Sequence, residues 1–86
     1  MKITTKSGFK CDIDKKIMKD WRLIKALQKC QHEDTALDGG VELERMLLGV
    51  EGSNALESHL EALDGVVTAD KVFEELTEIM GKLSKN

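Results

Sequence analysis

An apolar stripe with helical spacing runs through the C-terminal part of the chain. Its members recur every three or four residues, with mostly charged or polar residues between them: Val72, Phe73, Leu76, Ile79, Met80 and Leu83. This period matches the α-helix and does not fit a strand. We predict an amphipathic helix here, with the hydroxyl of Thr68 capping its first turn. The apolar face of such a helix has to pack against another element.

The composition indicates that the apolar face of this helix packs mainly against other helices of the same chain. The chain of 86 residues has no proline, and only 3% of its residues are aromatic, so Leu, Ile, Val and Met must fill the interior. A chain this short closes around one core. We therefore predict a single domain over residues 1–86, mainly α with a small N-terminal β-hairpin (α+β). The hairpin spans residues 1–13, and a compact bundle of about four helices spans residues 14–86.

The hairpin prediction rests on apolar residues that alternate with polar ones. Two runs of this kind lie within residues 2–13 and are joined by Lys6-Ser7-Gly8, a sequence suited to a three-residue loop with Gly8 in the left-handed conformation. An isolated hairpin is only marginally stable in water. We expect its apolar side chains to rest on helices, and these are Ile3, Phe9, Cys11 and Ile13.

The first helix is predicted from about Lys15 to His32 or Glu33, with Asp14 as its N-cap. Its apolar positions cover a wide arc: Ile17, Met18, Trp21, Leu23, Ile24, Ala26, Leu27 and Cys30. A helix with so wide an arc either lies at the centre of the fold or offers a second face to a partner.

Residues 31–40 are polar and end in Gly39-Gly40, which predicts a loop that includes a short turn. A second helix is expected over residues 41–48, ending at Gly49.

Ser53 is expected to cap a third helix that runs through Leu63 and is closed by Gly65. We expect the last three residues, 84–86, to be frayed.

Charge and hydropathy narrow the classes of function. The formal net charge is −3, whereas nucleic-acid binding depends on a concentrated positive field. No apolar run approaches the length of a membrane span, and residues 1–10 lack the apolar stretch of a signal peptide. The expectation is a cytoplasmic protein with no nucleic-acid or membrane partner, in which Cys11 and Cys30 are buried thiols.

Basic residues cluster in the first third of the chain, while its middle and end are acidic. The cluster comprises Lys2, Lys6, Lys10, Lys15, Lys16, Lys19, Arg22, Lys25 and Lys29. We interpret it as a solvated face, with docking of a partner as the alternative.

Motifs for catalysis or metal binding are not found in the sequence. The one local group of possible metal ligands has unsuitable spacing: Cys30, His32, Glu33 and Asp34. Carboxylate pairs such as Glu42 and Glu44 are expected on solvated helix faces, and His59 is expected to be a half-buried packing residue. The glycine pairs lack the lysine and hydroxyl residue of a phosphate loop. We predict no enzyme activity, no cofactor and no metal.

Four segments together resemble a known family. They are ITTKSGFKCDID, DKKIMKDWRLIKAL, RMLLGVEG and SNALESHLEALDGVVTADKVFEELTEIMGKL, and they span nearly the whole chain. This layout is similar to the small tail assembly chaperones that siphophages and prophages of Gram-positive bacteria encode just before the tape-measure protein. The resemblance implies a protein of the bacterial host cytoplasm that escorts the tape-measure protein until the tail tube polymerises around it. It assigns no binding residue.

A chaperone for a helical client needs exposed apolar surface, and methionine suits such surfaces because it is flexible. From helical position we select as partner-binding candidates Met18, Trp21, Met46, Leu48 and Met80. The alternative is that each of them is a core residue.

Two other functions stay open. One is a self-assembling structural protein of a phage tail or head-tail joint, and the other is a small transcriptional regulator, for which a basic recognition helix is lacking. We expect a homo-oligomer in each case, because a small domain with wide apolar arcs gains burial by pairing.

Overall fold

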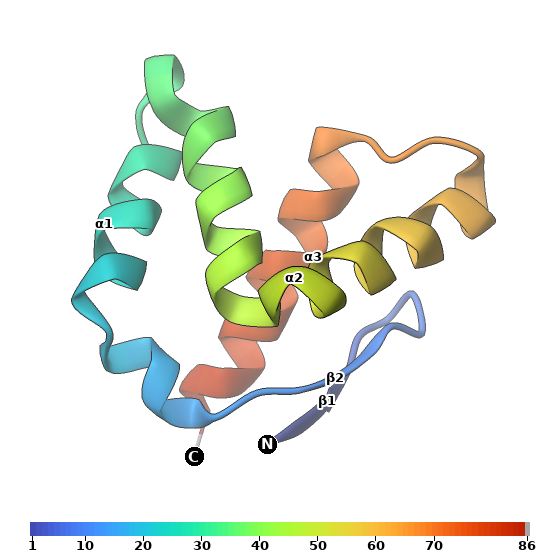
Figure 1. Cartoon of the computed structure of the whole chain (residues 1–86), viewed down its shortest axis with the longest axis horizontal. Helices are drawn as coiled ribbons and strands as arrows, with labels where there is room; N and C mark the ends of the chain where they lie inside the picture. The colour runs from blue at the N-terminus through green and yellow to red at the C-terminus, as the bar shows by residue number, and fades with distance from the viewer. Residues whose placement is uncertain (86) are drawn as a thin grey trace.

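Helices make up most of residues 1–85, the part of the chain that the computed structural model describes (Figure 1). This part has three α-helices, two short 3-10 helices and one two-stranded sheet. In chain order the elements are β1 (Lys2–Thr4), β2 (Lys10–Asp12), η1 (Lys15–Lys19), α1 (Trp21–Cys30), η2 (Glu33–Thr35), α2 (Ala36–Asp64) and α3 (Ala69–Ser84). The predicted class, mainly helical with an N-terminal hairpin, is confirmed. Residue 86 of the end expected to fray lies outside the described residues.

The hairpin is antiparallel, with Ile3 opposite Cys11. Gly8 has a φ of 97°, the left-handed conformation expected of it. Hydrogen bonds attach the hairpin loop to the helices: the Thr5 hydroxyl donates to Glu75 Oε1 over 2.7 Å, and the Lys6 backbone N–H donates to Glu78 Oε2 over 2.9 Å. As predicted, the hairpin is not isolated but rests on helices.

The prediction of one continuous first helix is wrong. Asp14 does cap a helix, because its carboxylate accepts a hydrogen bond from the Lys16 N–H, but that helix is the single 3-10 turn η1. Asp20 then adopts an extended backbone conformation, and its carboxylate accepts from the Arg22 N–H over 2.8 Å. A second aspartate in capping geometry therefore ends the first turn and starts α1 at Trp21, six residues later than predicted.

Gly39 and Gly40 do not end a loop, contrary to prediction. Both are buried inside α2, which begins at Ala36 directly after the short turn η2. A Cβ atom at Gly39 would lie 2.7 Å from the backbone nitrogen of Cys30, and one at Gly40 would lie 2.6 Å from Phe73 Cζ. These glycines allow α2 to pack closely against α1 and α3.

The helices predicted on either side of Gly49 form one bent helix, so the expected number of about four helices is slightly too high. The bend is at Gly49 itself, which has a φ of 74° and a ψ of 178°. We call residues 36–48 the first arm of α2 and residues 50–64 its second arm. Ser53 is not a cap, because it lies within the second arm, where its side chain is buried. Gly65 ends α2 with a φ of 80°, as predicted.

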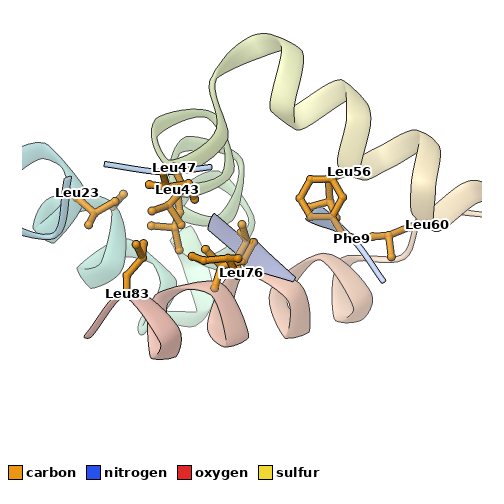
Figure 2. Packing of buried hydrophobic residues seen from close by; sticks show 12 residues of the cluster. Phe9, Leu23, Leu43, Leu47, Leu56, Leu60, Leu76 and Leu83 are labelled. Atoms are coloured by element: carbon orange, nitrogen blue, oxygen red, sulfur yellow. The ribbon is translucent and has the colours of Figure 1, made fainter. Parts of the chain in front are cut away.

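The buried apolar side chains form one cluster to which the hairpin and all three α-helices contribute. In Figure 2, Phe9 lies with Leu56 and Leu60 toward one end of this cluster, and Leu23 and Leu83 lie toward the other. The stripe on α3 is correctly predicted: Leu76, Ile79 and Leu83 are fully buried, and Val72 and Met80 pack at the margin of the cluster. The predicted cap of α3 is also confirmed, because the Thr68 hydroxyl accepts a hydrogen bond from the Lys71 N–H.

Candidate functional site

Four of the five predicted partner-binding residues face the interior. Met18, Met46, Leu48 and Met80 are half-buried and pack against the core cluster. Trp21, the only tryptophan, differs from them because 69% of its surface is exposed. The five residues therefore do not form one continuous exposed patch, and Trp21 is the candidate with the most surface to offer a partner.

Trp21 is exposed because it lies on the side of α1 that faces away from the core. Leu23 and Ala26 face the core, which turns Trp21 and Ile24 outward, and Ile24 is 40% exposed. Lys25 lies one turn after Trp21 on the same side of the helix. We call Trp21, Ile24 and Lys25 the α1 surface.

A basic groove lies between α1 and the first arm of α2. Its volume is about 470 Å³, and Val41 and Met46 supply its apolar lining. Four basic side chains and one acidic side chain complete it: Arg22, Lys25, Lys29, Arg45 and Glu42. Lys29 Nζ lies 2.6 Å from Glu42 Oε2, and this hydrogen bond raises the pKa of Lys29. The groove keeps a local excess of positive charge although the whole chain is negative.

An acidic cleft lies between the second arm of α2 and α3, and Lys6 and Ser7 of the hairpin loop contribute to its wall. Its volume is about 1160 Å³, and its apolar lining consists of Leu60, Leu63 and Phe73. Five carboxylates and two lysines also line it, and the carboxylates are Asp64, Asp70, Glu74, Glu75 and Glu78. The cleft is thus larger than the basic groove and opposite to it in charge.

Exposed apolar side chains also gather where α2 connects to α3, a surface that the sequence pattern did not predict. Leu63 is 60% exposed, and Val66 and Val67 in the connection are exposed as well. The signal available in the sequence was a pair of valines between Gly65 and Thr68, outside any helical stripe.

Two carboxylates are buried rather than solvated, contrary to prediction. Glu75 is 6% exposed and accepts a hydrogen bond from the Thr5 hydroxyl. Glu44 is 7% exposed, and its Oε2 atom has no hydrogen-bond partner within residues 1–85. Burial, together with the neighbouring Glu57 carboxyl group, raises the pKa of Glu44 from 4.5 to about 7. The carboxyl groups of Glu44 and Glu57 come from the two arms of α2, so this pair spans the bend at Gly49.

The other residues considered for catalysis or metal binding are His59 and the two cysteines, and each packs within the fold. His59 is half-buried, its ring centroid lies 5.8 Å from that of Phe9, and its Nε2 atom lies 3.1 Å from the Ser7 hydroxyl oxygen. Cys11 and Cys30 are unpaired and half-buried, and burial is the main cause that raises the pKa of each thiol.

Across residues 1–85, no group of three or more His, Cys, Asp or Glu side chains is arranged so that it could hold a metal ion. In the same part of the chain, no helix combines the length and apolar character needed to cross a membrane.

Comparison with known proteins does not identify a relative. No protein-family model matches this chain, and no curated protein or solved structure matches it.

Proposed function

We propose that this chain is a phage tail assembly chaperone that binds the tape-measure protein in the host cytoplasm and keeps it soluble until the tail tube assembles. The proposal combines the resemblance of the whole sequence layout to that family with one observation on the surface. That observation is the 69% exposure of Trp21 beside a groove with an apolar lining.

The physical basis is the chemistry of the client. A tape-measure protein is long, apolar and helical, so it exposes amphipathic helices until the tube encloses it. Such a helix binds where apolar side chains are exposed, and aromatic residues contribute much of the energy of protein interfaces. We place the contact on the α1 surface. Met46 lines the adjacent basic groove, while Met18, Leu48 and Met80 support the core beneath the surface.

Co-expression with the tape-measure protein tests this proposal. The gene to use is the very long reading frame, rich in helical repeats, that should follow this one. Wild-type chain should keep that protein soluble and co-purify with it. Trp21→Ser should abolish co-purification while the circular dichroism spectrum stays helical, because Trp21 is exposed and contributes little to the core.

Val50→Ser is the matched control. Val50 is also an exposed apolar residue, at 56%, but it lies at the bend of α2 and lines neither the basic groove nor the acidic cleft. This variant should retain the client. Retention of the client by Trp21→Ser would contradict the proposal.

A second candidate function is a self-assembling structural protein of the tail or head-tail joint. The opposite charges of the basic groove and the acidic cleft favour it, because such surfaces attract each other in neighbouring copies. The two functions differ in the purified virion: a structural protein is present there, whereas a chaperone is absent.

A further inference from the structure

Charge is strongly segregated along this chain. Residues 1–30 contain nine basic and three acidic residues, which gives a net charge of +6, and residues 31–86 contain four basic and thirteen acidic residues, which gives −9. The sum is the formal net charge of −3. The small net value therefore hides two large opposite charges.

The two hollows of opposite charge lie toward opposite ends of the molecule, although the two charged segments do not. Lys6 of the basic segment lines the acidic cleft, and Glu42 of the acidic segment lines the basic groove. In Figure 1, α1 lies at the left and the connection between α2 and α3 lies at the right of the longest axis. The basic groove adjoins α1, and the acidic cleft lies between the second arm of α2 and α3. Each end also exposes apolar side chains: Trp21 and Ile24 at the basic end, and Leu63, Val66 and Val67 at the acidic end.

We infer that copies of this chain associate head to tail, with the α1 surface of one copy seated in the acidic cleft of the next. Opposite charges favour this pairing, whereas contact between two basic ends or two acidic ends is repulsive. The apolar side chains at both ends gain burial in the same contact. The α1 surface and the acidic cleft are different surfaces, so the contact is heterologous and can continue from copy to copy.

The dimensions of the cleft support a polypeptide as its occupant. Its volume of about 1160 Å³ exceeds that of most small-molecule pockets, which is roughly 300–1,000 Å³. Its apolar lining matches the apolar part of the α1 surface, and its carboxylates match the charge of Lys25, whereas Arg22 and Lys29 are already paired with Asp20 and Glu42. A second copy supplies Trp21, Ile24 and Lys25 on one helix.

Association between copies does not require a client. It has one consequence for the proposed function: a client and a second copy compete for the α1 surface.

The first measurement is the mass of the wild-type chain by light scattering across a range of concentrations. The mass should rise with concentration above that of one chain, and Trp21 fluorescence should shift to shorter wavelength as the contact buries the indole. A single species with the mass of one chain at every concentration would overturn the inference.

Two variants then disable one end each. The first combines Trp21→Ser with Lys25→Glu, and the second combines Leu63→Ser with Asp64→Lys. All four positions are exposed, and lysine at the C-terminus of α2 is favourable for the helix dipole, so both variants should fold. Each should weaken self-association at least about tenfold, because it replaces attraction with like-charge repulsion and removes apolar contact.

Mixing the two variants is the decisive step. Each variant retains one intact end, and only one complementary pair of ends remains in the mixture. The mixture should therefore form a 1:1 complex with twice the mass of one chain and grow no further. A mixture that stays monomeric, or single variants that associate like wild type, would exclude the head-to-tail contact.

The control for altered charge is Lys10→Glu, which makes the same change as Lys25→Glu at an exposed position of β2. It should associate like wild type, and equal weakening by Lys10→Glu would contradict the assigned surfaces.

The double variant with Leu63→Ser and Asp64→Lys separates the association of copies from the binding of a client. It keeps the α1 surface and should still co-purify with the client. Failure of the client experiment would thus leave the contact between copies unaffected.

Discussion

Glu44 shows how a single residue makes the fold sensitive to pH. Its carboxyl group is buried next to Glu57, and the pKa of Glu44 is raised to about 7. Burial without a full set of hydrogen bonds is costly for a charged group. The folded chain therefore binds this proton more tightly than the unfolded chain does.

The sign of the effect on stability follows from this difference. Below pH 4.5 Glu44 is protonated in both states, so it causes no loss of stability. Between pH 4.5 and 7 the unfolded chain releases the proton first, and the free energy of unfolding falls as pH rises. The upper limit of the loss is on the order of 3 kcal/mol, because each pKa unit corresponds to about 1.4 kcal/mol.

Glu44→Gln should remove this dependence. The amide does not titrate, so the variant should be more stable than wild type at pH 8, and its advantage should shrink toward pH 4.5. Urea unfolding of both proteins at several pH values measures the difference. Glu61→Gln, at an exposed position of the same helix, should follow the wild-type profile. Parallel profiles for wild type and Glu44→Gln would show that Glu44 is not the titrating group.

At the scale of elements, the sequence predicted best where the signal was local. The two-residue alternation of the hairpin, the stripe on α3, the cap at Thr68 and the left-handed Gly65 depend on neighbouring residues alone, and all are confirmed. The start of α1 was missed because Asp14 and Asp20 both have the chemistry of a cap, and the sequence does not show that each caps its own helix.

The prediction of α2 was wrong because its course depends on tertiary contacts. Gly39-Gly40 is a typical loop sequence, yet both residues are helical because α1 and the ring of Phe73 approach them closely. Tertiary contacts also decide which of the predicted partner-binding residues are exposed. Trp21 fits an apolar helical stripe as well as an exposed position, and it is exposed because Leu23 and Ala26 are the residues of α1 that face the core.

The close contact of α1 and α2 gives a prediction at this scale. Gly39→Ala should destabilise the protein by about 1–3 kcal/mol, because the added methyl group meets backbone atoms of α1 that are unable to move aside. The Cβ atom would lie 2.7 Å from the Cys30 nitrogen and 2.9 Å from the Ala26 carbonyl oxygen. Chemical denaturation measures the change.

Gly81→Ala provides the comparison. Gly81 is also helical, but it is exposed on α3 and has no neighbouring atom within 4 Å of an added Cβ. Alanine there should stabilise the protein by about 0.5–1 kcal/mol through helix propensity alone. Equal stabilisation by both substitutions would show that the helices do not pack closely at Gly39.

At the scale of the whole molecule, the arrangement of charge matters more than its sum. A molecule with a net charge of −3 spread evenly repels its own copies. This chain instead presents the basic groove near one end and the acidic cleft near the other. The two arrangements respond to salt in opposite directions, because salt weakens repulsion in the first and attraction in the second.

Raising sodium chloride from about 0.1 M to about 1 M shortens the Debye length from about 10 Å to about 3 Å. Head-to-tail association should then weaken, with the dissociation constant rising several-fold, because the attraction between Lys25 and the carboxylates of the cleft is screened. Sedimentation velocity measures the constant, and circular dichroism at both concentrations confirms that the fold is unchanged. Association that strengthens with salt would mean that the copies meet through like-charged surfaces, which the proposed pairing of α1 with the acidic cleft excludes.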